Sequence, residues 1–207
     1  MSSISGIEIV FAIISIVTAI SLHEMMHAVA GYFLGDDTAK SQGRISFNPL
    51  VHVDMFTTIL LPLILLIAGA PPIGAAKPVP FNPTRLKFDE YGAALLALAG
   101  PATNFLLAVV GATSYKIAFN YGWELAASGF AIFTVVNIGF FVFNMLPVPP
   151  LDGSRVLYAF APDSVRRLMD NLERMGILII MFVFVFAYPL VRPLLVWANR
   201  ALLNLIV

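Results

Sequence analysis

The sequence predicts an all-α polytopic membrane protein. Of its 207 residues, 59% are hydrophobic and only 12% are charged, whereas a soluble domain carries about 25% charged residues. The mean hydropathy is +0.90, and the apolar residues gather in long runs between polar or proline-rich stretches. We therefore expect about four full transmembrane helices plus a re-entrant segment with short extended pieces, all in a single domain over residues 1–207.

The elements follow from the lengths of the apolar runs. The first span covers Ile7 to Leu34, which exceeds the roughly 20 residues needed to cross a bilayer. The run from Thr57 to Ala70 is too short to cross and suits a re-entrant segment, and the proline-rich stretch after it, up to Pro83, cannot form a regular helix. A polar loop or surface helix is expected at residues 154–174. The remaining spans are predicted over Tyr91–Phe119, Trp123–Leu146 and Met175–Val196, the last one kinked near its prolines.

Composition also restricts the function. The net charge is zero, which gives no reason to expect nucleic acid as a partner, and the absence of cysteine excludes disulfides and thiolate metal sites. The N-terminus lacks the basic region of a cleavable signal peptide, so the first apolar stretch is expected to remain in the mature protein.

The most informative motif lies inside the first span, at His23-Glu24-Met25-Met26-His27. On a helix, residues i and i+4 share one face, so both imidazoles can bind one zinc ion. Glu24 beside them can take a proton from a water on that metal. A helix end with satisfied polar residues is the alternative, but ionisable groups at membrane depth are costly and mark functional sites. We therefore expect one zinc ion per chain.

A catalytic zinc takes three protein ligands and a water, so one ligand remains to be found. Asp152 is the first candidate, because it follows a span in a proline-rich break that can aim its side chain into the protein. His52 competes with it, either as a ligand or as a polar neighbour of the site. Asn104 lies within a span and is expected either to line the site, where it would contact substrate, or to hydrogen-bond between packed helices.

Three motifs, in this order, resemble the site-2 protease family of intramembrane zinc metalloproteases. They are the histidine motif, Gly100-Pro101-Ala102-Thr103-Asn104, and Asn144-x-x-Pro147-x-Pro149-x-Leu151-Asp152-Gly153. The stretches Asn48–Asp54 and Lys77–Pro80 resemble the compact prokaryotic branch of that family, which has no appended PDZ or CBS domain.

The resemblance implies a role for each matched residue. His23, His27 and Asp152 would be the zinc ligands, and Glu24 the general base and later the acid. Asn144 would hold the substrate backbone or the oxyanion. The implied activity is hydrolysis of peptide bonds within or near the transmembrane segments of membrane protein substrates, by a multi-pass protein of the prokaryotic cell membrane.

A protease holds its substrate extended, and the simplest way is to add it to the edge of a strand. Ala76 to Phe81 is a candidate for that strand, with a proline-stiffened loop as the alternative. Pro78 and Pro80 lack N–H groups. The N–H groups of Lys77, Val79 and Phe81 lie on the other edge and are expected to bind substrate.

The zinc site also constrains the topology. The spans that carry the histidines and precede Asp152 both reach the metal at their C-terminal ends, so they run parallel and the span between them runs antiparallel. The segment from Asp36 to Glu90 must then start and end on one face. The two long loops on that face hold nine of the twelve lysines and arginines: Lys40, Arg44, Lys77, Arg85, Lys87, Arg155, Arg166, Arg167 and Arg174.

The positive-inside rule makes this face cytoplasmic. His27 precedes Leu34 by about seven residues, roughly 10 Å of helix, which places the zinc inside the membrane and towards the cytoplasm.

Two rival functions share these features. A catalytically silent scaffold or chaperone would keep the fold, but the intact Glu24 argues against it. A metal transporter would need polar groups leading to both faces, and the spans offer few of these beyond Asn104, Asn137 and Asn144. The expected partners are the lipid bilayer and a membrane protein substrate, with room for a regulatory partner.

Overall fold

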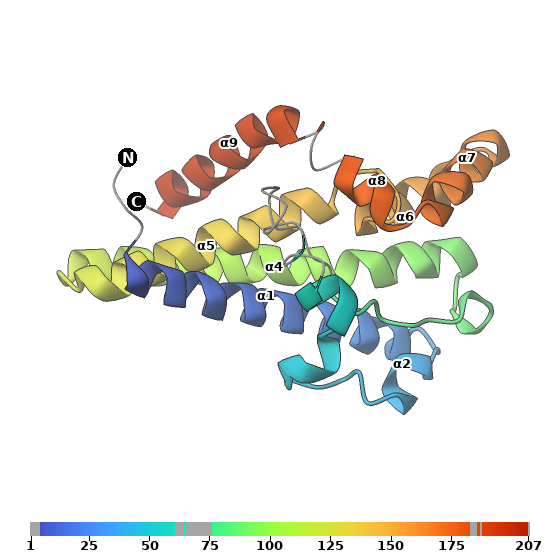
Figure 1. The fold of residues 1–207 in the computed structure, drawn as a ribbon, viewed down its shortest axis with the longest axis horizontal. Helices are drawn as coiled ribbons and strands as arrows, with labels where there is room; N and C mark the ends of the chain where they lie inside the picture. Colours follow the sequence, from blue (N-terminus) through green and yellow to red (C-terminus); the bar gives the residue numbers. More distant parts are fainter. Residues whose placement is uncertain (1–4, 61–63, 65–75, 183–185, 187, 207) are drawn as a thin grey trace.

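Three long helices form the frame of the protein. The computed structural model describes residues 5–60, 64, 76–182, 186 and 188–206. Side by side along its long axis lie α1 (Gly6–Phe33), α4 (Asp89–Asn120) and α5 (Glu124–Asn144) (Figure 1). Each is long and apolar enough to cross a membrane, and each lies within three residues of a predicted span. α1 and α5 run in the same direction and α4 runs opposite to both, as the topology argument required.

Packing between these helices uses small residues. Ala19, Ala28, Ala108 and Ala112 are fully buried, whereas large apolar side chains such as Ile13 face outwards with about half of their surface exposed. This pattern is typical of helices in lipid, where small residues allow backbones to approach closely and lipid covers the large side chains.

The predicted fourth span, Met175–Val196, is described only in part. The described residues here form α8 (Ile177–Phe182) and α9 (Tyr188–Ile206), and neither by itself qualifies as a membrane span. Arg192 and Arg200 interrupt the apolar run of α9. One face of α9 still packs on the frame, where Leu195 and Leu202 approach the core cluster around Ile138. Four full transmembrane helices are therefore not confirmed; three are found among the described residues.

The segment between α1 and α4 returns to the place where it began. It contains α2 (Thr38–Ser41), the 3₁₀ turn η1 (Pro49–His52), the π-helical turn η2 (Met55–Leu60) and the 3₁₀ turn η3 (Pro83–Arg85). The Lys87 N–H donates to Leu34 O at the end of α1, over 2.8 Å. The Asn82 N–H donates to the Asp36 carboxylate over 2.6 Å. Both ends of the segment therefore lie on one face, as expected.

Two features predicted for this segment are not confirmed. The re-entrant stretch from Thr57 to Ala70 lies largely outside the described residues. The residues from Ala76 to Phe81 form no strand, and no strand occurs elsewhere in the described chain.

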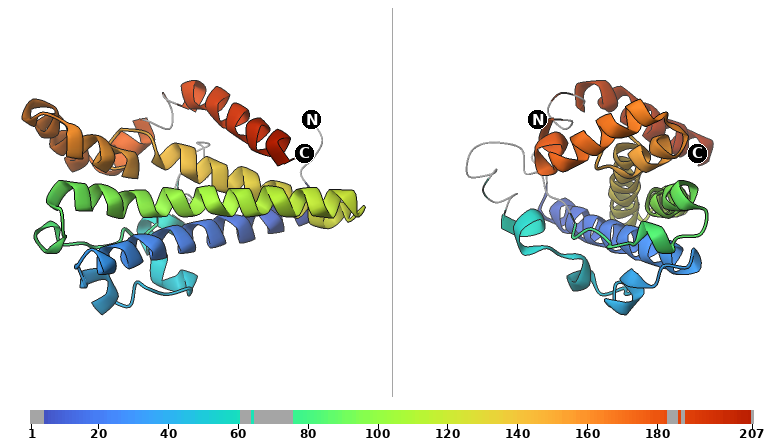
Figure 2. Two further views of the ribbon diagram at one scale, coloured as in Figure 1. Left: turned by 180° about the vertical axis from the view of Figure 1, so that it is seen from behind. Right: turned by 90° about the vertical axis from the view of Figure 1, so that its right-hand side faces the viewer.

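After α5, the chain forms α6 (Asp152–Phe160) and α7 (Asp163–Arg174). These two helices occupy the region predicted as a polar loop or surface helix. α6 packs against α4. Figure 2 shows α6 and α7 at the same end of the frame as α2, so the long connections gather at one end.

Candidate metal centre

His23 and His27 lie one turn apart on α1 and point to a common position. Both residues are only 5% exposed, and their Nε2 atoms are 3.0 Å apart. The helix itself produces this pairing, because side chains at i and i+4 stand on one face.

Asp152 reaches the same position from a different helix. Its Oδ2 lies 3.1 Å from His23 Nε2 and 3.3 Å from His27 Nε2. Asp152 is the first residue of α6, and the neighbouring Gly153 makes the approach possible. A Cβ atom at Gly153 would lie 2.3 Å from Met145 O, at the end of α5, so the chain can turn this tightly only with glycine.

The second ring nitrogen of each imidazole, Nδ1, also has a hydrogen-bond partner. Nδ1 of His27 lies 2.8 Å from Leu96 O, and Nδ1 of His23 lies 2.6 Å from Asn104 Oδ1. A backbone carbonyl can only accept, so His27 carries its proton on Nδ1 and its Nε2 is left with a lone pair. Such outer partners fix the tautomer and orientation of metal-binding histidines.

This donor set fits a divalent cation. One ligand atom from each of the three residues lies within 4.8 Å of the others. Asp152 Oδ2 is buried, and no hydrogen-bond donor reaches it within the described chain. Two imidazole nitrogens and one carboxylate oxygen facing one point would repel each other without a cation, and they match the three-ligand set of catalytic zinc sites.

Helix α4 passes directly over the imidazoles at Gly100. A Cβ atom at this position would lie 2.4 Å from His27 Nε2 and 2.7 Å from His23 Cε1. Gly100 therefore permits this close approach of α4 to α1, and a side chain at this position would collide with both imidazole rings.

Glu24 stands beside the three donors and is not one of them. Its side chain is half-buried and interacts electrostatically with both histidines, Asp152 and His52. It also faces Arg44 in the loop after α1: burial lowers the pKa of the Arg44 guanidinium, and the Glu24 carboxylate acts in the opposite direction.

His52 does not join the metal group. It is 1% exposed, and its Nε2 lies 3.0 Å from Ser46 O. Its buried Nδ1 has no partner among the described residues. Of the two candidates for a third ligand, the structure thus brings Asp152 to the histidines and leaves His52 as a neighbour of Glu24.

Asn104 and Asn144 differ in how their amide groups are engaged. Asn104 is fully buried, and both ends of its amide are engaged, so it is a partner of His23 and no substrate can reach it. Asn144 is half-buried at the end of α5. Its Nδ2 donates to Phe140 O over 3.0 Å, which leaves its second amide hydrogen available.

The residues expected to bind substrate are held at both ends of their segment. The Lys77 N–H donates to His52 O over 2.9 Å, so it is not available to a substrate, and this part of the expectation is corrected. Val79 and Phe81 are half-buried, and their N–H groups make no hydrogen bond in the described chain. The Phe81 ring lies 5.8 Å from the guanidinium of Arg155 on α6, one turn after Asp152.

Two residues of this region were not anticipated from the sequence. Arg44 is 3% exposed and donates to three carbonyl oxygens, those of Val51, Lys77 and Pro78. Nothing in the sequence distinguishes it from other loop cations. Asn137 is fully buried on α5 and contacts Asn104. The one feature of the sequence that could have indicated it is a polar residue within an apolar span.

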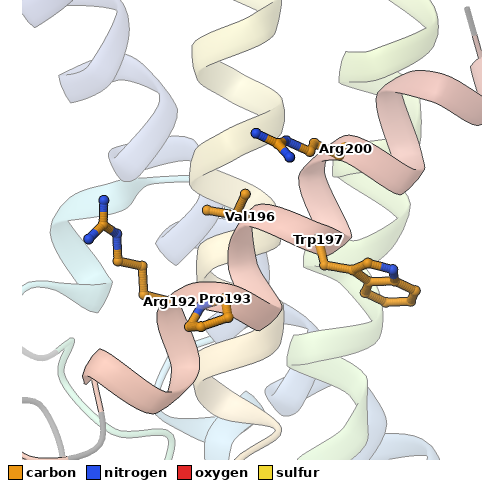
Figure 3. A pocket seen from close by; sticks show the side chains of 5 residues that line it. All are labelled: Arg192, Pro193, Val196, Trp197 and Arg200. Carbon is orange, nitrogen blue, oxygen red and sulfur yellow. The ribbon is translucent and has the colours of Figure 1, made fainter.

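A hollow of about 480 Å³ lies elsewhere, along α9. Figure 3 shows the side chains that line it, and none of them belongs to the metal centre: Arg192, Pro193, Val196, Trp197 and Arg200.

The fold and the site together define a membrane protein with a three-residue metal centre between its long helices. The family model described as Peptidase family M50 matches residues 120–188, which include Asn144 and Asp152. The chain is 36% identical over 182 residues to "Putative zinc metalloprotease YwhC" of Bacillus subtilis (strain 168), a match that covers 84% of this chain and 80% of the relative. The chain therefore belongs to peptidase family M50, the site-2 protease family.

More distant relatives carry a similar name. The chain is 25% identical over 167 residues to "Putative zinc metalloprotease Rip2" of Mycolicibacterium smegmatis, and it covers 63% of that protein's length. The protein of the same name from Mycobacterium tuberculosis (strain H37Rv) is 24% identical over 166 residues, again with 63% of its length covered. No solved structure matches the chain. The predicted zinc cofactor is confirmed by these names together with the His–His–Asp group.

Proposed function

We propose that the protein is an intramembrane endopeptidase that hydrolyses peptide bonds within or near the transmembrane segments of other membrane proteins. The observation that carries this proposal is the position of the His–His–Asp group. Two of its members lie in α1, a helix apolar enough to span a membrane, next to a carboxylate that is not a ligand. A transmembrane peptide bond would have to come to this depth to be cleaved.

His23, His27 and Asp152 would hold the metal. A zinc ion in this site supplies Lewis acidity, which makes water a better nucleophile at neutral pH and polarises a carbonyl group. Glu24 would accept the proton of the attacking water on its carboxylate and pass it to the leaving nitrogen. The second amide hydrogen of Asn144 would stabilise the oxygen of the scissile carbonyl as negative charge develops on it.

The segment from Val79 to Phe81 would hold the substrate backbone. The N–H groups of Val79 and Phe81, which have no partner among the described residues, lie between two anchored positions, Lys77 and Asn82. The Phe81 ring lies 5.8 Å from the guanidinium of Arg155 on α6. Pairing with these backbone N–H groups would favour an unwound substrate over a helical one, because only an extended backbone offers its carbonyl groups to them.

The active site would open towards the cytoplasm of a prokaryotic cell. The helix end that carries the metal centre is also the end where the long, cation-rich loops gather (Figure 2), and the positive-inside rule assigns such loops to the cytoplasm.

The proposal is tested with purified protein in liposomes together with a single-span substrate. Glu24→Gln should bind zinc as the wild type does and cleave the substrate at least about 100-fold more slowly, the lower range for general acid–base catalysis. Turnover close to wild type would refute the role of Glu24. Zinc uptake into the liposomes without any cleavage would instead favour a transporter, and protein without zinc would favour a silent scaffold.

A further inference from the structure

A chain of buried amides connects all three long helices at the metal centre. Asn104 on α4 and Asn137 on α5 are both fully buried. Asn104 Oδ1 lies 2.6 Å from His23 Nδ1 on α1. Asn104 Nδ2 donates to Asn137 Oδ1 over 3.0 Å and to Ala19 O over 3.3 Å. Asn137 Nδ2 donates to Phe133 O over 2.9 Å.

The direction of these hydrogen bonds is fixed at two backbone carbonyls. Phe133 O can only accept, so Asn137 must present its nitrogen there and its oxygen to Asn104. Ala19 O can also only accept, which requires the nitrogen of Asn104 on that side. The only group of Asn104 left for His23 is therefore its oxygen. Because this oxygen can only accept a hydrogen bond, His23 must be protonated on Nδ1 and donate it.

This proton decides whether His23 can bind metal. A neutral imidazole carries one proton on one of its two nitrogens. Only the form with the proton on Nδ1 leaves Nε2 with a lone pair, and Nε2 is the atom that faces His27 and Asp152. His27 obtains the same tautomer directly from Leu96 O, whereas His23 depends on a side-chain amide that could rotate.

We propose that Asn137 is a positioning residue of the metal centre: it prevents the amide of Asn104 from turning over and thereby keeps the His23 proton on Nδ1. Asn137 itself contacts neither histidine. The inference rests on the ligand set of the proposed function and deepens it, but it does not depend on the substrate.

The test is zinc affinity, measured by chelator competition on the full-length protein without substrate. Asn137→Leu keeps the shape of the side chain and removes both polar ends. We expect its zinc Kd to rise about 10- to 100-fold, the range found when partners of metal-bound histidines are removed. An unchanged Kd would overturn the proposal.

A matched control is available on the same helix. Thr134 is also fully buried on α5, one turn before Asn137, and its hydroxyl donates only to its own helix, at Phe130 O. Thr134→Val should lower thermal stability to an extent similar to Asn137→Leu and leave the zinc Kd unchanged. An equal rise of Kd in both variants would mean that Asn137 acts only on general packing.

Two further measurements keep the inference testable. In the wild type stripped of metal, ¹⁵N NMR of the imidazoles should show His23 protonated on Nδ1, and an unprotonated Nδ1 would refute the proposal even if no Asn137 variant folds.

Asn104→Ala should weaken zinc binding as well. Adding Asn137→Leu to Asn104→Ala should raise the zinc Kd no further, because both residues act through one hydrogen bond. If the two substitutions lower the zinc affinity additively, Asn137 does not act through Asn104. Failure of every preparation to cleave substrate would overturn the proposed peptidase and leave these results untouched.

Discussion

Each of the three ligand residues is held in place by its surroundings. Leu96 O orients His27, an amide orients His23, and Asp152 enters through a turn that only glycine allows at the next position. This support matters because a site that is even slightly loose loses metal affinity. Asp152 is the one ligand that does not belong to α1, so a metal bound here would link α1 to α6.

Removing this carboxylate should remove the metal. We expect Asp152→Ala to bind zinc more than about 100-fold more weakly than the wild type, a larger effect than loss of a second-sphere partner, and to lose cleavage with it. Asp163→Ala is the matched control, because Asp163 likewise begins a helix, α7, but is exposed and distant from the metal. Zinc content after gel filtration measures both.

His52→Ala should retain zinc, because His52 lies outside the His–His–Asp group. Its thermal stability should fall, since a ring that is 1% exposed leaves a cavity when it is removed. If His52→Ala loses zinc and Asp152→Ala keeps it, the third ligand has been assigned to the wrong residue.

At the scale of elements, the segment from Lys77 to Asn82 is hydrogen-bonded to the rest of the protein at both ends, whereas backbone N–H groups in its middle have no partner among the described residues. Arg44 holds the carbonyls of Lys77 and Pro78, and Asp36 holds the N–H of Asn82. Between them, the N–H groups of Val79 and Phe81 have no partner in the described chain. A backbone that is already ordered loses little entropy when another chain pairs with it.

The prediction is that Val79→Pro cleaves more slowly without losing zinc. Proline deletes one donor with little change in volume, and one net hydrogen bond of about 0.5–1.5 kcal/mol corresponds to a decrease of kcat/KM of about 2- to 10-fold. Val79→Ala is the control, because it shortens the side chain and keeps the N–H. If Val79→Pro cleaves like the wild type, or if Val79→Ala is equally slow, the segment does not bind substrate through this N–H.

The long helices could be predicted from the sequence, and the contacts between distant segments could not. α1, α4 and α5 follow from long, predominantly apolar runs, and the histidine pair follows from helical spacing alone. The engagement of the Lys77 N–H by His52 O depends on how two loops meet, which no local pattern encodes. The orientation of Asn104 depends on carbonyls from two other helices, so the sequence marked the residue but left its role open.

The last predicted span stays unconfirmed. Apolar composition between Met175 and Val196 favours one kinked helix, and the structure describes this stretch only in part, as α8 and the beginning of α9, which carries two arginines. Length and hydropathy alone do not say how an apolar segment with charges and prolines packs against its neighbours.

At the scale of the whole molecule, function and charge are gathered at one end of the bundle. The connections at that end, with the short helices α2, α6 and α7, contain nine of the twelve cations. His23 and His27 lie in the C-terminal half of α1, and Asp152 begins α6 shortly after the end of α5. A substrate helix would therefore be reached from one side of the membrane only. This asymmetry makes the orientation of the protein a direct test of the proposed function.

The two ends of the segment between α1 and α4 should be accessible from the cytoplasm, and the turn between α4 and α5 should not. The wild type has no cysteine, so Gln42→Cys, Arg85→Cys and Asn120→Cys give single labels at positions that are all exposed. The hydrogen bond from Lys87 to Leu34 requires the first two on one side, and α4 carries Asn120 to the other. An impermeant thiol reagent should label the first two in inverted vesicles and Asn120 in right-side-out vesicles. Labelling of Gln42→Cys and Arg85→Cys from opposite sides would contradict the parallel arrangement of α1 and α5, whereas labelling of both from outside would leave the fold intact and reverse the proposed orientation.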